Sequence, residues 1–375
     1  MKRLDLHGDV VAESPHRVFT RSPFGDGAHT GRPAAMEMIG VDLHKRESQL
    51  CIQSSEGAFT EQRIMTGRAS FAALFAGRPR ARVLVEASTE SEWVARYLES
   101  LGHEVIVADP GFAPMYATRS KKVKTDKRDA RALCEACARG TYRAIHRASD
   151  EQRHVRAELA VRDALVRTRT RYVAIIKAMV RREGLRLRSG EPAHTAAKLA
   201  ELALPVGLQS ELAPLVSLLE PVNAQVAAAT ARLTALARGN PVVTRLQTIP
   251  GVGPITALAF VAALDDVTRF ASAHQVQAYL GLVPSEFSSG ERQLRGRITK
   301  RGNARVRWLL VEAAWRVMRA RDVEADRLRA WAERIALRRG KRIAAVALAR
   351  RLAGIMYAIW RDGTVYQGGS QAIAA

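Results

Sequence analysis

Two short apolar runs on either side of an amphipathic segment place the strongest limit on how this chain can fold. ARVLVEAS (81–88) and HEVIVADP (103–110) have the length and the apolar character of strands in the buried centre of a sheet. The segment between them, TESEWVARYLESLG (89–102), has the period of an amphipathic helix and ends at a glycine. A strand, a helix and a second strand in this order indicate an α/β fold.

The residues before this unit predict further strands. An apolar strand in MEMIGVDL (36–43) ends at Asp42, and a second, alternating strand runs through residues 49–53. A turn at Glu56 and Gly57 precedes a third strand. Together with the strand–helix–strand unit, this hairpin predicts an α/β domain over residues 36–145.

The rest of the chain is predicted to be helical. Residues 153–184 form a basic amphipathic stretch with no internal Gly or Pro, and an Ala/Leu-rich stretch follows at about 209–238. Two such helices predict an antiparallel helical hairpin or coiled coil, a spacer that also touches phosphates or a partner protomer. The predicted organisation is a disordered extension (1–35), the α/β domain (36–145), a helical coiled-coil region (146–240), a helical C-terminal domain (241–362) and a loose tail (363–375).

The charge balance narrows the class of partner. The chain has 59 Lys and Arg against 37 Asp and Glu, a net charge of +22, and such an excess attracts polyanions, of which nucleic acid is the usual one. No run comes near the roughly 20 apolar residues of a membrane span, and no apolar signal core precedes the first strand. We therefore expect no membrane partner and a cytoplasmic, nucleoid-associated protein of a prokaryote. Cys134 and Cys137 form a CxxC, which we interpret as helix packing because a zinc site needs four ligands.

Two carboxylates interrupt a basic cluster in KVKTDKRDARAL (122–133). Asp126 and Asp129 are three residues apart, so the first turn of a helix places them on one face. One explanation is a solvated, salt-bridged helix end, where aspartate is favoured by the helix dipole. The basic residues around the pair would then only neutralise it.

Two further acids favour a metal site instead. Asp42 and Glu86 each end a core strand, although acids are poor strand formers and are rarely buried without a partner. In such a hairpin-first α/β sheet the two strands would be neighbours, and the later helix with Asp126 and Asp129 could pack across them, so that the four carboxylates form an all-oxygen site. Such a site suits hard divalent ions, and we expect two Mg²⁺, with Mn²⁺ as a substitute. The basic residues expected to hold the nucleic-acid backbone beside it are Lys121, Lys122, Lys124, Lys127 and Arg128.

These motifs resemble a known family. IGVDLHK, VLVEAS and KTDKRDARAL are similar to the D, E and paired D motifs of the RNase H/RuvC-like DEDD domain in transposases of the insertion sequence 110 family. That family includes the Piv/MooV DNA invertases and bridge-RNA-guided recombinases. The resemblance implies that Asp42, Glu86, Asp126 and Asp129 are catalytic metal ligands.

The resemblance continues in the last third of the chain and covers about residues 38–365. PGVGP (250–254) is a helix-hairpin-helix-like turn in which Gly251 and Gly253 would let the backbone approach a phosphate; the alternative is a plain interhelical turn. In SSGERQLRGRITKRGNAR the family implies that the serine before the glycine, Ser289, is the nucleophile, and the adjacent Ser288 remains an alternative. The basic residues expected to hold phosphate there are Arg292, Arg295, Arg297, Lys300, Arg301 and Arg305.

The family therefore implies a serine- and metal-dependent DNA recombinase of a mobile element, acting as a dimer or tetramer and directed in some members by an element-encoded bridge RNA. In such an assembly the carboxylate domain of one subunit completes the serine site of another. Two other readings remain open. One is a metal-dependent, structure-selective nuclease such as a junction resolvase, and the other is a nucleic-acid-binding protein without catalysis.

Overall fold

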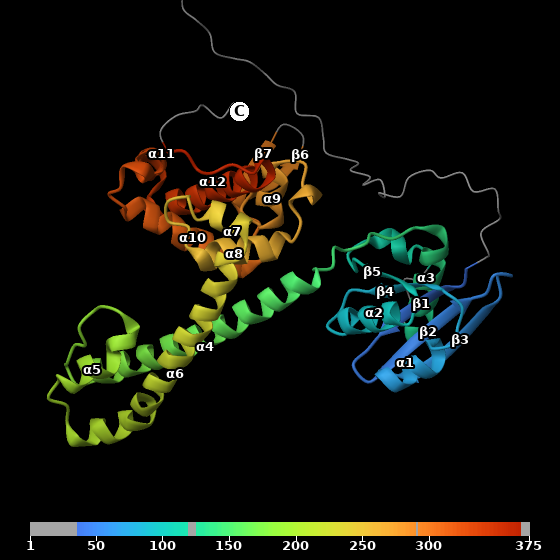
Figure 1. The fold of residues 1–375 in the computed structure, drawn as a ribbon, viewed down its shortest axis with the longest axis horizontal. Coiled ribbons are helices and arrows are strands. Elements are labelled where there is room, and N and C mark those ends of the chain that lie inside the picture. The colour runs from blue at the N-terminus through green and yellow to red at the C-terminus, as the bar shows by residue number, and fades with distance from the viewer. Residues whose placement is uncertain (1–35, 119–124, 290–291, 369–375) are drawn as a thin grey trace, which may run out of the picture. The chain divides into compact units, whose positions relative to one another are not determined.

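The computed structural model describes residues 36–118, 125–289 and 292–368, coloured in Figure 1. The predictions for residues 1–35, for the end of the tail (369–375) and for Lys121, Lys122 and Lys124 lie outside the described residues. The same holds for the side chains of residues 287–289 and 291–295. The chain divides into two units, one ending at Arg147 and the other beginning at Ala148.

The first unit is built on a five-stranded mixed sheet of order β3-β2-β1-β4-β5. The strands are β1 (Met38–Leu43), β2 (Glu47–Gln53), β3 (Phe59–Met65), β4 (Arg82–Glu86) and β5 (Glu104–Ala108). The first three strands form antiparallel pairs, whereas β4 runs parallel to both β1 and β5. The predicted hairpin-first α/β fold is confirmed, including the placement of β1 beside β4.

Helices cover both faces of this sheet. On one face α1 (Arg68–Phe75) and α2 (Ser91–Ser100) pack on the alternate strand residues Ile39, Val41, Val83 and Val85. The opposite face carries α3 (Asp126–Arg139), together with the short 3₁₀ helix η1 (Ala113–Tyr116). Because side chains alternate along a strand, Asp42 and Glu86 lie on the α3 face. Helix α1 was not predicted from the sequence.

A single glycine sets how closely α3 approaches the sheet. A Cβ atom added to Gly40 in β1 would lie 2.2 Å from the backbone nitrogen of Cys134 and 2.3 Å from the carbonyl oxygen of Ala130. The helix meets the strand there through small side chains only. Cys134 and Cys137 are buried free thiols in this contact, and the Sγ of Cys134 donates to the carbonyl oxygen of Met38 at 3.1 Å. The structure therefore gives the CxxC a packing role.

The second unit begins with two long antiparallel helices, α4 (Asp150–Arg182) and α6 (Val206–Arg238), packed along one another (Figure 1). Arg162 in the first half of α4 donates to Thr230 in the second half of α6, and Arg169 donates to Asn223. The loop region between them contains the 3₁₀ helix η2 (Pro192–His194) and α5 (Thr195–Ala200).

The C-terminal part of this unit has one large core. Residues from the start of α4 (Val155, Leu159) and from the end of α6 (Leu233, Ala237) belong to it as well. Its helices are α7 (Pro241–Leu246), α8 (Pro254–Leu264), η3 (Val267–Arg269), α9 (Ala273–Tyr279), α10 (Ala304–Arg319), η4 (Val323–Ala325), α11 (Asp326–Arg339) and α12 (Lys341–Asp362). The segment read from sequence as a polar loop (285–303) is largely a β-hairpin of β6 (Pro284–Ser289) and β7 (Arg292–Ile298). Its period-two pattern is short and rich in charge, which is why it reads as a loop.

Two helices of the second unit, α6 and α12, are long and apolar enough to pass a composition test for a membrane span. The expectation that no stretch comes near such a span was therefore too strong. In the structure α12 lies in the C-terminal core through Leu348, Leu352 and Met356, and α6 packs on α4. Core helices meet the same length and hydropathy criteria as spanning helices, so the two are weak evidence for a membrane.

Candidate active site

All four predicted acids line one cleft in the first unit. The cleft has a volume of about 910 Å³ and lies at the carboxyl ends of β1 and β4, beside the first turn of α3. Val41 pairs with Val85, so the next residues along the two parallel strands are Asp42 and Glu86. Asp126 and Asp129 approach from α3, which packs across the same strands. Strand order and helix packing together bring four acids from distant parts of the sequence to one place.

The four acids differ in their contact with solvent. Asp42 and Asp129 are buried, with exposed fractions of 9% and 5%. Glu86 is half-buried, and its carboxylate accepts a hydrogen bond from the hydroxyl of Tyr116 in η1. Asp126, the first residue of α3, is exposed. The cleft therefore has a buried floor formed by Asp42 and Asp129 and a solvent-exposed side at Asp126.

Burial raises the pKa of Asp42 to about 6, and His44 counteracts part of this shift. The nearby charges of Asp129, Asp126 and Glu86 raise the pKa of Asp42 further. Carboxylates that disfavour one another's ionisation in a buried place mark a site that lacks positive charge. Such an environment is what a divalent cation would stabilise, and this supports the fit of the donor set to a metal.

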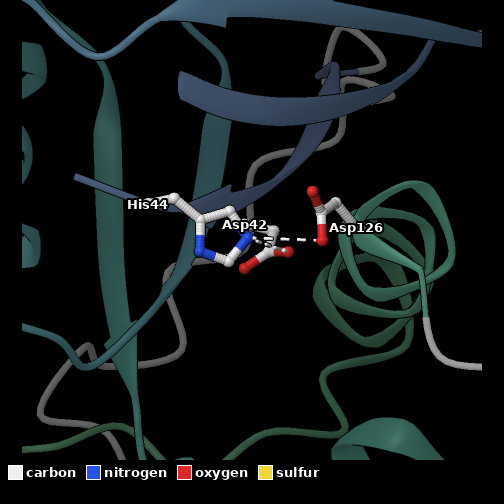
Figure 2. A group of neighbouring side chains, drawn as sticks. All are labelled: Asp42, His44 and Asp126. Carbon is white, nitrogen blue, oxygen red and sulfur yellow. Dashed lines mark ion pairs between the residues drawn. The ribbon is translucent and has the colours of Figure 1, made fainter. Parts of the chain in front are cut away.

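His44 is a member of the cluster that sequence reasoning missed. Its Nε2 atom lies 3.3 Å from Oδ2 of Asp42 and 3.4 Å from Oδ1 of Asp126. The dashed lines in Figure 2 mark these ion pairs. One ligand atom from each of these three side chains lies within 4.8 Å of the other two, a grouping that could hold a metal ion. The spacing Asp42-x-His44 was a usable signal, because residues two apart on an extended chain point the same way. Tyr116 had no such signal, because it is 30 residues from Glu86 in sequence.

The basic residues beside the acids are only partly described. Lys127 is exposed and its Nζ lies 3.9 Å from a carboxylate oxygen of Glu61 on β3, while Arg128 is exposed on the next position of α3. Neither side chain lines the carboxylate cleft itself, although both follow Asp126 in the first turn of the helix. Thr125 caps the N-terminus of the helix, because its side chain accepts a hydrogen bond from the backbone N–H of Arg128.

The predicted nucleophile belongs to the second unit. Ser289 is the last residue of β6, and its backbone pairs with that of Arg292 at the start of β7; Ser288 pairs with Gln293. The nearby Ser285 uses its hydroxyl to donate to the carbonyl oxygen of Arg297 at 2.9 Å. The two candidate serines therefore lie at the hairpin end, whereas Ser285 lies at its base.

The basic residues of this hairpin region fall into two groups. Arg297, Lys300 and Arg301 are exposed. Arg305 instead lies 3.4 Å from Asp163 of α4, with both side chains 17% exposed. Burial lowers the pKa of Arg305, and the charge of Asp163 opposes that shift. Arg305 therefore has a structural partner, and the side chains of Arg292 and Arg295 lie outside the described part of the chain.

The two glycines of PGVGP occupy different environments. Gly251 has a φ of +79°, and a Cβ added there would lie 2.7 Å from the carbonyl oxygen of Ala313 in α10. Its lack of a side chain is therefore explained by packing between helices. Gly253 immediately precedes α8 and has more space, since the nearest neighbour of an added Cβ would be Nη1 of Arg316 at 3.8 Å. The prediction of a phosphate contact stays open for both.

A mixed sheet with four carboxylates converging at one end, followed by a mostly helical unit, fits a RuvC-like DEDD domain. Residues 39–183 match the family model of DEDD transposases of IS110 elements, and residues 243–329 match the model described as "Transposase IS116/IS110/IS902 family". Three curated relatives agree with both matches. A probable family 20 transposase of Pseudomonas aeruginosa is 32% identical over 89% of this chain and 99% of its own length.

The other two are the transposases for IS1111A of Coxiella burnetii and for IS1328 of Yersinia enterocolitica, each 30% identical. They cover 89% and 88% of this chain and 92% and 98% of their own lengths, respectively. The chain belongs to the IS116/IS110/IS902 family of transposases and is an enzyme of DNA transposition. The DEDD domain implies a divalent metal.

Proposed function

We propose that this transposase cuts and rejoins DNA through Ser289, assisted by two Mg²⁺ ions held by Asp42, Glu86, Asp126 and Asp129. The observation that carries the proposal is the convergence of these four acids, from β1, β4 and α3, on one cleft. Mn²⁺ is the expected substitute, because it accepts the same oxygen ligands. DNA is the substrate, and the protein acts on the DNA of a prokaryotic nucleoid.

The reaction begins with attack of the Ser289 hydroxyl oxygen on a backbone phosphorus. The new Ser–O–P bond replaces one P–O bond to the sugar, and that sugar oxygen leaves with a proton as a hydroxyl. Attack of a second DNA hydroxyl on the phosphoserine reverses the exchange, joins the new strands and returns the proton to the serine. When bound, the metal ions supply charge neutralisation at the phosphate oxygens. The exposed Arg297, Lys300 and Arg301 hold the backbone next to the hairpin.

The parts of the chain divide this work. Residues 36–145 carry the metal site, and residues 241–362 carry the serine hairpin and a helix-hairpin-helix-like turn at 250–254 that contacts the backbone of DNA. The helical region 146–240 acts as a coiled-coil spacer between subunits. The active form is a dimer or tetramer in which the carboxylate domain of one subunit completes the serine site of another. An element-encoded bridge RNA selects the donor and target sequences.

A trapping experiment tests the serine. The protein is expressed with the noncoding region that flanks its element, incubated with end-labelled element DNA and Mg²⁺, and separated on a denaturing gel. We expect a protein–DNA adduct that Ser289→Ala abolishes and that the matched control Ser288→Ala retains. Loss of the adduct in Ser288→Ala alone would move the nucleophile to that residue.

The same gel separates the competing chemistry. Cut DNA without any adduct would refute the serine mechanism and support a metal-dependent nuclease, because attack by water leaves no covalent link. Asp42→Asn should abolish the adduct while leaving the far-ultraviolet circular dichroism unchanged. Omission of the flanking noncoding region should abolish the reaction if an RNA directs it, and an undiminished yield would refute RNA guidance.

A further inference from the structure

The corner between α11 and α12 carries the densest run of positive charge in the described C-terminal part. Five basic side chains there are exposed, and we call them the basic corner: Arg334, Arg338, Arg339, Lys341 and Arg342. The sequence has no acid between Glu333 and Asp362. Within the described ranges no carboxylate forms an ion pair with any of the five. Charge of one sign without local compensation favours a polyanionic partner.

The basic corner also contains an apolar cleft. The cleft has a volume of about 500 Å³ and is lined by Trp331, Ile335 and Leu337 together with Arg334 and Arg338. Leu337 is 87% exposed, an unusual position for a leucine between arginines. Trp331 is held in place because it packs against the C-terminal core and because the guanidinium of Arg351 lies 4.8 Å from its ring centroid. The basic side chains could therefore contact phosphates next to an apolar surface formed by Trp331, Ile335 and Leu337.

Both features together select the kind of nucleic acid. A duplex presents its phosphates outward and keeps the faces of its bases stacked inside, so it would use the arginines but leave the apolar wall in water. An unpaired strand presents phosphates and base faces side by side, and base contact with apolar or aromatic side chains adds about 1–3 kcal/mol per base. A second copy of the same surface would face like charge, which disfavours self-association through this corner.

We propose that the basic corner and its cleft bind an unpaired DNA strand, since the family to which this chain belongs acts on DNA. The surface lies beyond residue 329, where the match to the transposase family model ends, and in a different part of the chain from the carboxylate cleft. The proposal does not depend on which serine attacks DNA or on which metal the acids hold. It adds a site for single-stranded DNA to a DNA transposase.

Binding by the full chain tests this site. Fluorescence anisotropy is measured with fluorescein-labelled 20-nucleotide oligo(dT), 20-nucleotide oligo(U) and a 20-base-pair duplex. One variant, Arg338→Gln with Arg342→Gln, removes charge, and a second, Leu337→Ser, removes the exposed apolar side chain. The control, Arg186→Gln with Arg188→Gln, makes the same charge change at two exposed arginines near the far end of α4.

We expect the charge variant to weaken single-strand binding by about tenfold or more. It should lower the log–log salt slope by about 1.4, because each phosphate contact on a single strand contributes about 0.7. Leu337→Ser should weaken single-strand binding and leave duplex binding within twofold. The control should stay within twofold of the unmodified protein on the single strands. We expect the larger effect on oligo(dT), and a larger effect on oligo(U) would overturn the assignment to DNA.

Three results would overturn the proposal. Equal losses in the charge variant and the control would show a general charge effect. Equal losses of Leu337→Ser on single strand and duplex would remove the preference for unpaired bases. Unchanged nucleic-acid binding with a changed sedimentation coefficient would assign the corner to contact with a second copy of the chain. Since Leu337 is on the surface, its variant remains informative even if the double charge variant fails to fold.

Discussion

Replacement of Gly40 by alanine should separate catalysis from stability in this protein. Gly40 lies on β1 two residues before Asp42, where the backbone of α3 crosses the strand. The added Cβ would lie 2.2 Å from the nitrogen of Cys134, whereas ordinary contact begins at 3.4 Å. The obstacle is backbone rather than the end of a flexible side chain, so α3 must move away from the sheet by about 1 Å.

That displacement acts on the candidate metal site directly. Asp126 and Asp129 move with α3, while Asp42 and Glu86 stay with the sheet. Overpacking of this kind costs roughly 1–3 kcal/mol of stability, but a misplacement of about 1 Å at a catalytic site costs on the order of 100-fold in rate. We therefore expect Gly40→Ala to lose about two orders of magnitude in adduct formation while the first unit remains folded.

Three measurements check this expectation: adduct yield with time, Mn²⁺ affinity by calorimetry, and thermal unfolding. Gly77→Ala is the matched control, because a Cβ at Gly77 would meet nothing within 4 Å. Wild-type activity and metal affinity in Gly40→Ala would refute the claim that the close approach of α3 assembles the acids. Complete unfolding would show that the contact supports the fold more than the site, and Gly40→Ser, which is larger, would then unfold as well.

Three further predictions concern charge. Burial raises the pKa of Asp42 to about 6. Between about pH 4 and pH 6 the folded carboxyl therefore keeps a proton that the unfolded carboxyl has released. The free energy of unfolding of the metal-free protein should therefore fall as the pH rises through this window. Asp42→Asn should remove this pH dependence and raise the stability of the metal-free protein at pH 7 by up to ~3 kcal/mol. Thermal unfolding in EDTA measures this stability, and a variant less stable than the parent would contradict the prediction. Asp163→Asn leaves the half-buried Arg305 without its ion pair and should cost about 2 kcal/mol in urea unfolding, with part regained in the double variant with Arg305→Met. The affinity for a 30-base-pair duplex should fall steeply with salt, and a flat log–log plot would argue against phosphate binding by the basic faces.

The sequence by itself determined the local elements and the positions of the acids along them. Short apolar runs have few solutions other than buried strands, and a charged residue at the end of such a run stands out because burial of a lone charge is costly. This reasoning was enough to expect that the strands bearing Asp42 and Glu86 are neighbours and that the helix of Asp126 and Asp129 crosses them, as the sheet order and packing show. The resemblance to the transposase family rested on the same short motifs.

Only the tertiary structure decided which other side chains join these sites. Tyr116 reaches Glu86 from 30 residues away, although nothing in the sequence singled it out. Arg305, which the sequence assigned to phosphate, is paired with Asp163 of another helix. The role of Gly40 was equally hidden, because it depends on how near a helix 90 residues later comes to the strand. Periodicity and residue type report local preference, whereas these contacts arise from long-range packing, which no single segment encodes.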